Sequence, residues 1–328
     1  QLHVNKVLHA GVLQADAVIR LHHGEMVKTV VMTIPQDVME KVERLTNRGQ
    51  LIFSAINCRK HLNAVPSLIL HDWQTSLAIQ RMMNKVSRVK DIIDNKQKSW
   101  PEAFYVLLCR SLGTGINSDS CERLARSLPY VYLQKHADNI RQLEAMLLGQ
   151  GNLIEDETTR SEYEFLRAKF NLRPIGNCAW KHSKIRPVSS PRSRLKALSI
   201  IINRQPNLFS KILECQDVKS LTKLLYVPNL LGASTIGSII INSVIPTIMA
   251  YGQWQEDLDL CERSIDMLEA LPSEANRYME QWISCGIPLR SALESQAMLQ
   301  LYKEYCEPHR CLKCRIGCWL MKQRNMII

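Results

Sequence analysis

Residues 69–96 read ILHDWQTSLAIQRMMNKVSRVKDIIDNK, and their periodicity sets the expected architecture. Apolar side chains recur there at intervals of three to five residues, at Leu70, Trp73, Leu77, Met82, Val86, Val89 and Ile93. This spacing places them on one face of a helix and leaves a basic outer face. The segment therefore predicts a long amphipathic helix.

The sequence changes character around this helix. Residues 4–34 are rich in β-branched side chains and predict two or three strands, followed by a short helix to about residue 47. Beyond residue 66 the pattern predicts helices at residues 100–112, 118–128, 134–148, 161–170, 192–203, 208–214, 235–251, 256–271, 273–285 and 289–305. We predict an α+β, predominantly α-helical protein, with a small β-containing part at residues 1–66 and a multi-helix domain at residues 67–328.

Composition indicates a soluble globular protein. The chain has 328 residues, of which 46% are apolar and 22% charged, and its eleven cysteines are an odd number in a chain too long to need disulfides. A cytoplasmic location and no targeting segment are expected. Because the chain begins with Gln1 inside strand-like sequence, we expect a member truncated at its N-terminus.

Residues 224–255 carry no charge, which raises the question of a membrane span. Two prolines, a glycine and several Ser, Thr and Asn residues interrupt the run, and its strongest helix covers only residues 236–251. We therefore predict a buried helix of a soluble core and no membrane partner.

The net charge of +11 lies entirely in residues 165–213. These 49 residues contain eleven bases and no acid, whereas the rest of the chain has 31 of each. Phe170, Trp180 and Phe209 are interleaved with the bases, a pattern typical of segments that bind nucleic acid. The predicted polyanion contacts are Arg167, Lys169, Arg173, Lys181, Lys184, Arg186, Arg192, Arg194 and Lys196.

Two other interpretations of the basic segment stay open. Residues 155–164 and 253–271 are acidic and could neutralise the segment inside the fold, which would indicate a non-catalytic structural or interaction protein. In that case the basic segment would pack against an acidic helix at residues 256–269. The bases could also form a simple solvated face.

A cysteine-rich string, YCEPHRCLKCRIGC, occupies residues 305–318. Two cysteines separated by two intervening residues can bind one metal ion from a single turn. The spacing C-x4-C-x2-C followed by a distant fourth cysteine is found at iron–sulfur clusters. The predicted ligands of a structural zinc ion or an iron–sulfur cluster are Cys306, Cys311, Cys314 and Cys318, with Cys58, Cys285 or His309 as alternative fourth ligand. Plain buried thiols of a core are the competing interpretation.

The sequence contains no Walker loop, no dinucleotide-binding glycine motif, no H-E-x-x-H and no G-x-S-x-G. It therefore leaves open whether the protein is an enzyme.

Six strings together resemble a family of uncharacterised bacterial proteins that is known only as a domain of unknown function. They are NSDSCERLARSLP, RQLEAMLLGQGNLI, EYEFLRAKF, IINSVIPTIMAYG, SQAMLQLYKEYC and RCLKCRIG, and the resemblance runs from about residue 5 to about residue 320. It implies that Cys306, Cys311 and Cys314 belong to the family pattern and that Cys318 does not. It thus favours a distant fourth ligand such as Cys58.

The resemblance also reveals one difference between this sequence and the family pattern, and it suggests an activity. The family shows Arg-Pro-x-Asn-Phe-Pro where residues 186–191 read RPVSSP, so an aromatic anchor is missing. An upstream part in longer members is similar to the carboxylate metal site of restriction-endonuclease-like nucleases. On that analogy the protein would be the inactive remnant of a nuclease, because Gln1, Leu2 and His3 supply no carboxylate.

Overall fold

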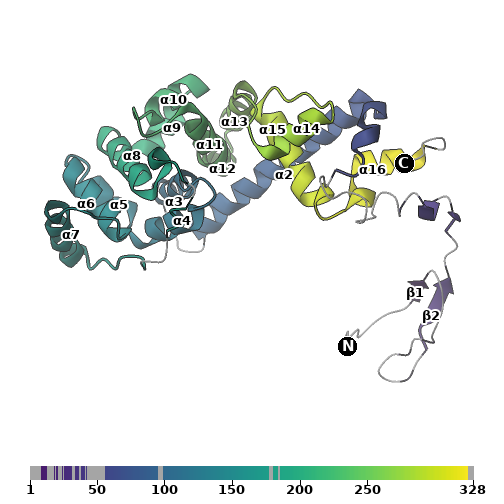
Figure 1. Cartoon of the computed structure of the whole chain (residues 1–328), viewed down its shortest axis with the longest axis horizontal. Coiled ribbons are helices and arrows are strands. Elements are labelled where there is room, and N and C mark those ends of the chain that lie inside the picture. Colours follow the sequence, from purple (N-terminus) through teal and green to yellow (C-terminus); the bar gives the residue numbers. More distant parts are fainter. Residues whose placement is uncertain are drawn as a thin grey trace. The chain divides into compact units, whose positions relative to one another are not determined.

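The protein is mostly helical in the computed structural model (Figure 1). The structure describes residues 9–12, 18, 20, 24, 26–31, 34–36, 38–40, 42, 56–94, 99–176, 180–183 and 185–323. Two compact units are present, one made of residues 1–73 and 301–328 and the other of residues 74–300. The boundary at residue 66 marks a change in sequence character, and it stays a prediction.

Strand structure is sparse in the described residues. β1 (His9–Val12) and β2 (Lys28–Val31) pair in parallel, with His9 opposite Lys28, and Arg20 and Met26 form an isolated antiparallel bridge. The predominantly helical prediction is confirmed, whereas the β-containing part amounts to these two short strands. Most of the predicted helix ending near residue 47 lies outside the described residues.

The first unit is built from short pieces of chain that lie far apart in sequence. It contains η1 (Arg59–Ala64), the first residues of α2 (Ser67–Asp94), the π-helix η5 (Tyr302–Cys306), η6 (Cys311–Lys313) and α16 (Arg315–Lys322). The Trp73 ring meets the Tyr305 ring edge-on, with centroids 5.3 Å apart, and the Arg315 guanidinium lies over the Trp73 ring, 5.0 Å from its centroid. These contacts join the start of α2 to the C-terminal segment.

The second unit is a helical body around one hydrophobic core. Its helices after α2 are α3 (Trp100–Leu112), α4 (Ser118–Ser127), α5 (Tyr130–Lys135), α6 (Ile140–Gln150), α7 (Glu157–Phe170), η3 (Pro187–Ser189), α8 (Pro191–Arg204), α9 (Leu208–Glu214), α10 (Val218–Leu225), α11 (Ala233–Ile239), η4 (Ile240–Val244), α12 (Ile245–Gln255), α13 (Leu258–Ala270), α14 (Arg277–Ser284) and α15 (Ala292–Leu301). Helix α3 is apolar on nearly every side and lies at the centre, since eight of its thirteen residues are buried.

Side-chain caps explain where the helices differ from prediction. The helix predicted at residues 134–148 begins at Ile140, because the Asn139 side chain accepts hydrogen bonds from the backbone N–H groups of Arg141 and Gln142. Residues upstream form the separate helix α5. Helices α10 and α16 were not predicted, although Asp217 and Ser220 form a capping box at the start of α10.

Residues 233–255 of the uncharged run form a continuous helical segment, α11–η4–α12, that includes a π-turn. Residues 233–255 are long and apolar enough to cross a membrane by length and composition, yet 67% of the apolar window is buried inside the protein. Ser243 of the π-turn donates a hydrogen bond to the Leu107 carbonyl, which ties the segment to α3. Such burial is typical of a core helix of a soluble protein.

Candidate functional site

Four thiols from distant segments line one small cavity of the first unit. The cavity has a volume of about 20 Å³, and Cys58, Cys306, Cys311 and Cys314 lie around it together with Asn57, Tyr305 and Gly317. A side-chain contact between Asn57 Nδ2 and His309 Nδ1, 3.2 Å apart, joins the segment of Cys58 to the C-terminal turn. The structure thus brings together three of the four predicted cysteines and the distant Cys58.

The turn that carries these thiols is sharply folded. After η5 the chain turns at His309, whose φ of 55° is left-handed, and Arg310 N–H donates to the Tyr305 carbonyl at 2.7 Å. Gly317 of α16 packs directly on the Cys311 carbonyl, where a β-carbon would overlap the backbone. A close approach that requires glycine therefore fixes Cys311 and Cys314 next to α16.

Burial makes two of these thiols, Cys311 and Cys314, poor acids. It raises the pKa of Cys311 to about 11 and also raises the pKa of Cys314, although nearby backbone N–H groups and the Trp73 indole oppose the shift at Cys314. A thiolate at Cys314 would be a stronger acceptor for the buried Trp73 indole N–H than the thiol is.

The other predicted ligands lie elsewhere. The Cys318 thiol donates to the Leu312 carbonyl at 3.0 Å and does not line the cavity, nor does His309. Cys285 follows α14 in the other unit. Within the described residues no three Cys, His, Asp or Glu side chains already converge as a metal site. Zinc and an iron–sulfur cluster therefore stay predictions.

The bases of α8 are used inside the protein. Arg192 forms an ion pair with Glu155, and Lys196 Nζ lies 3.9 Å from a carboxylate oxygen of Glu144. Arg194 is buried and donates to the Leu230 carbonyl at 3.0 Å and to the hydroxyls of Ser189 and Thr235. These three predicted contacts thus have internal partners.

The bases near the end of α7 and in the following loop are different. Lys169, Arg173, Lys181 and Arg186 are exposed, and none forms an ion pair with an acid among the described residues. We call these four the loop bases. Arg167 pairs with Glu164 in α7 at 3.0 Å, and Lys184 lies outside the described residues.

Two buried amides hold the backbone of this loop. Gln150 Nε2 donates to the Arg173 carbonyl at 2.5 Å and to Ser127 Oγ at 2.8 Å, while its Oε1 accepts from the Tyr163 hydroxyl. The Asn117 side chain bonds both the N–H and the carbonyl of Lys181, at 2.8 and 2.9 Å. These bonds are made to backbone groups of Arg173 and Lys181 and not to their basic side chains, which remain available to solvent.

The predicted aromatic interleaving does not supply exposed stacking platforms. Trp180 is buried, and its indole N–H donates to the Gly151 carbonyl at 2.7 Å. Phe209 is buried beside Trp100, and Phe170 stacks on Tyr132 with centroids 4.4 Å apart. Burial of these apolar rings in the core is energetically favoured over their exposure on a binding face.

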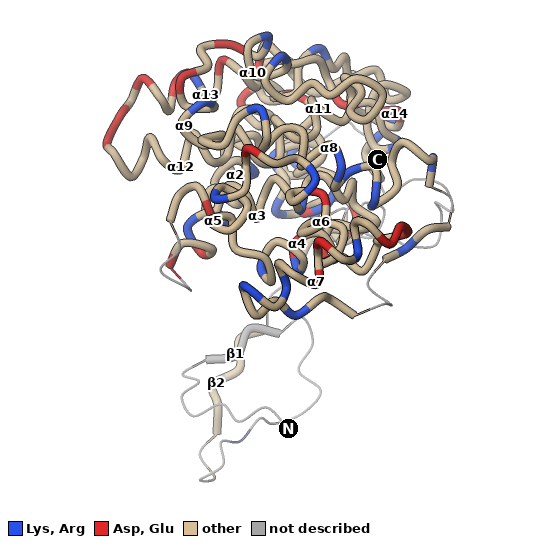
Figure 2. Tube along the Cα trace, turned by 90° about the vertical axis from the view of Figure 1, so that its left-hand side faces the viewer, with Lys and Arg blue, Asp and Glu red and all other residues tan. Residues whose placement is uncertain are grey.

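The acidic helix α13 does not neutralise the basic segment directly. Figure 2 shows acidic residues along the tube at α13, and basic stretches below α4 and α7. Among the described residues no ion pair joins α13 to residues 165–213. The acidic partners of the segment are instead Glu155 and Glu164 of the preceding acidic stretch, Glu144, and Glu214, which directly follows the segment.

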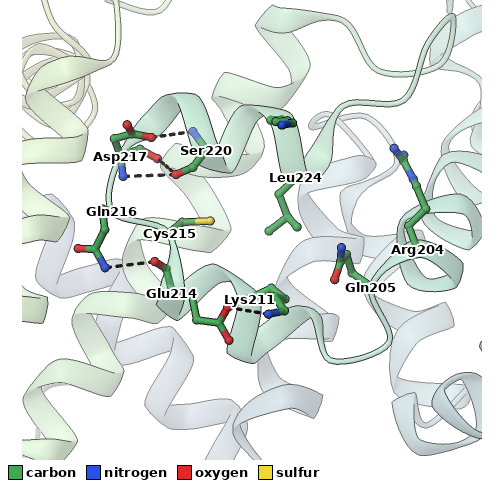
Figure 3. Close-up of a pocket in the computed structure, with 10 residues that line it drawn as sticks. Arg204, Gln205, Lys211, Glu214, Cys215, Gln216, Asp217, Ser220 and Leu224 are labelled. Carbon is green, nitrogen blue, oxygen red and sulfur yellow. Dashed lines mark hydrogen bonds and ion pairs between the residues drawn. The ribbon is translucent and has the colours of Figure 1, made fainter.

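An open groove of about 550 Å³ lies between the end of α8, α9 and the start of α10 (Figure 3). Its size suits a small ligand. However, Lys211 pairs with Glu214 at 2.6 Å, Asp217 caps α10, and Arg204 donates to the Tyr226 carbonyl. Its charged groups are therefore mostly satisfied by local partners.

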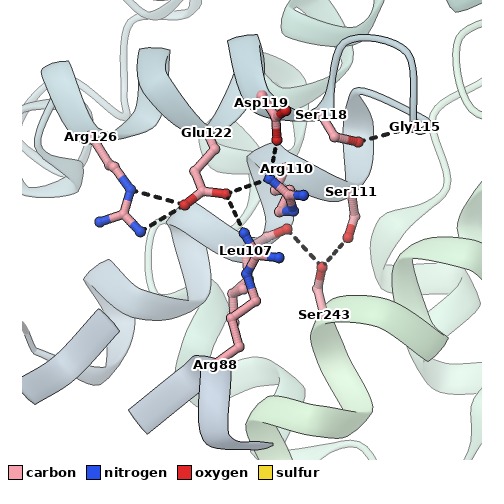
Figure 4. Close-up of polar contacts among 10 residues, drawn as sticks. All are labelled: Arg88, Leu107, Arg110, Ser111, Gly115, Ser118, Asp119, Glu122, Arg126 and Ser243. Atoms are coloured by element: carbon pink, nitrogen blue, oxygen red, sulfur yellow. Dashed lines mark hydrogen bonds and ion pairs between the residues drawn. The ribbon is translucent and has the colours of Figure 1, made fainter. Parts of the chain in front are cut away.

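A compact charge network joins α2, α3 and α4 (Figure 4). Glu122 accepts hydrogen bonds from Arg88, Arg110 and Arg126, each with a shortest distance of 2.7 Å, and Arg110 also reaches Asp119 at 2.6 Å. Burial alone would raise the pKa of Glu122, but the three guanidinium groups outweigh it and hold the pKa below its usual range. This network is a stabilising element of the helical unit.

Lys85 of α2 is a half-buried base with a strongly shifted pKa, a combination that often indicates chemistry. Its ammonium donates to Gln296 Oε1 at 2.6 Å and to the Ile241 carbonyl of the π-turn at 3.2 Å. Desolvation and the neighbouring Arg81 lower its pKa to about 7, against the opposing effect of Glu274. It lines neither the groove of Figure 3 nor the cysteine cavity, so its observed contacts support α2 packing on the π-turn.

Several of these positions could not be found from residue spacing. Gln150 and Asn117 are single polar residues in or beside apolar helices, and only their burial shows that they hold a loop. Cys58 is 248 positions from Cys306, and residue spacing left it as one of several candidate fourth ligands, which the resemblance then favoured.

Comparison with known proteins gives one match. The family model described as "Protein of unknown function (DUF2851)" matches residues 3–229. No curated protein and no solved structure matches the chain. The prediction of membership in a family of unknown function is therefore confirmed.

Proposed function

Since the chain belongs to the family of proteins of unknown function whose model it matches, membership assigns it no activity, and we propose from its own surface that it binds a polyanion, with nucleic acid as the expected partner. The observation that carries this proposal is the set of four loop bases, which are exposed and have no acidic partner among the described residues. A positive surface of this kind attracts phosphates without reading sequence.

The mode of binding follows from which groups are exposed. Buried Trp180 and Phe209 do not offer stacking faces, so contacts to the sugar–phosphate backbone carry the interaction. The bonds from Gln150 and Asn117 fix the loop backbone before a ligand arrives, which reduces the entropy lost on binding. We therefore expect similar affinities for different sequences of one nucleic-acid type.

The alternative function, a structural protein with an internally paired basic segment, is supported by α8, whose bases have partners within the protein. It gives no role to the loop bases. The nuclease interpretation depends on the resemblance alone, and no described residue adds to it.

The proposal predicts a steep salt dependence of binding to a labelled duplex. Four phosphate contacts give a slope of log K against log salt of about −3.6, hence roughly a hundredfold weaker binding between about 50 and about 200 mM salt. Fluorescence anisotropy measures both. Absence of binding at low salt would contradict the proposal.

Charge-reversal variants test whether the loop bases form the polyanion-binding surface. The double variant Arg173→Glu/Lys181→Glu should bind at least about tenfold more weakly, because two phosphate contacts become repulsive. Lys219→Glu/Lys223→Glu, on exposed positions of α10, changes net charge equally and is the matched control. An equal loss in both variants would show that net charge alone drives binding and would refute the assignment to the loop bases.

A further inference from the structure

We propose that Cys58, Cys306, Cys311 and Cys314 are the four ligands of one zinc ion, and that Cys318 is not a ligand. The proposal is independent of polyanion binding. It rests on four thiols from two separate pieces of chain, residue 58 and residues 306–314, that line one small cavity in the first unit.

The donor set indicates the class of metal. Four cysteine sulfurs with no carboxylate among the cavity-lining residues suit a soft or borderline ion, and a set of four thiolates is common at structural zinc sites. Four cysteine thiolates are also the ligand set of an iron–sulfur cluster, and the metal analysis described below distinguishes the two.

The surroundings supply what a thiolate site requires. Trp73 Nε1 is buried beside Cys314, and donors to the sulfurs orient and stabilise metal-bound thiolates. The hydrogen bond between Asn57 and His309 holds the segment of Cys58 against the turn that carries the other three ligands. Binding the ion would require the thiols to lose their protons and to move together, because no three of these described side chains are yet placed as metal ligands.

The site has a clear structural consequence. Segments more than 240 residues apart in the sequence meet at this cavity. A metal that binds only the folded state stabilises it. We infer that zinc joins the N-terminal and C-terminal segments of the first unit, in place of the large core that the second unit possesses.

The test uses the full chain, purified under reducing conditions. Elemental analysis should give one zinc per chain, and protein stripped by a chelator should bind Co²⁺ with thiolate charge-transfer absorption that Zn²⁺ abolishes. Cys58→Ser and Cys311→Ser should each weaken zinc binding by at least about a hundredfold. Cys318→Ser, in the same string but outside the cavity, is the matched control and should bind as the wild type does.

A second measurement needs no variant. Zinc should protect the four ligand thiols of the wild-type protein from alkylation while Cys318 continues to react, as read by peptide mass spectrometry. Zinc protection of Cys318 with Cys58 left reactive would overturn the assignment. Iron with sulfide in the purified protein, or no metal uptake by the reduced chain, would overturn the zinc proposal itself.

Discussion

Replacement of Gly149 by alanine should lower the free energy of unfolding of the helical unit by more than about 3 kcal/mol. Gly149 lies in α6 directly against the Tyr163 ring of α7, and a β-carbon there would overlap three atoms of that ring. The ring is buried and its hydroxyl donates to Gln150 Oε1 at 3.0 Å, so it cannot move aside without losing this bond. Chemical denaturation followed by circular dichroism measures the loss.

The control for this substitution is Gly237→Ala. Gly237 lies inside α11 with open space where the β-carbon would be added, so alanine should stabilise the protein by about 0.5–1 kcal/mol through helix propensity. If both variants changed stability equally, the close contact between α6 and α7 would not explain the effect of Gly149.

The same contact links stability to the proposed function. Gln150 follows Gly149 and bonds both Tyr163 and the Arg173 carbonyl, so displacement of the ring disturbs the support of the loop bases. We therefore expect Gly149→Ala to weaken duplex binding at temperatures where the protein is still folded. Anisotropy at low temperature distinguishes this local effect from global unfolding.

Helix periodicity predicted most of the fold. The face predicted for residues 69–96 is the buried face of α2, with Trp73, Leu77, Met82, Val86 and Val89 all in the core. The turn of the chain between α5 and α6 was missed because apolar spacing continues across it, and only the cap at Asn139 ends the pattern. The π-turn in the uncharged run gives no signal in the spacing of apolar residues.

Charge counting was less informative than periodicity about the candidate surface. It identified the basic segment correctly but could not separate Arg194, which is buried among backbone and hydroxyl acceptors, from exposed Arg173. That separation depends on which helix faces the core. The interleaved aromatic residues were misleading for the same reason, since an aromatic residue in a basic string can equally well serve the core.

Replacement of Glu122 by glutamine should destabilise the helical unit by about 2 kcal/mol at pH 7. The Glu122 carboxylate is only 12% exposed and accepts bonds from Arg88, Arg110 and Arg126. Glutamine keeps the size of the side chain but removes the charge that the three guanidinium groups share, and among the described residues only Arg110 retains a carboxylate partner, Asp119. Glu164→Gln is the control, because the exposed pair of Glu164 with Arg167 should contribute no more than about 0.5 kcal/mol.

The effect of Glu122 should depend on pH in a defined direction. Its pKa in the folded protein lies below its usual range, so the carboxylate contributes its full stability above the unfolded pKa of about 4.3. As the pH falls through the lowered folded pKa, the wild type loses this contribution, and its stability should approach that of Glu122→Gln. Urea denaturation of both proteins from neutral pH to about pH 3 tests this, and a difference that stayed constant over that range would show that the charge of Glu122 is not what stabilises the network.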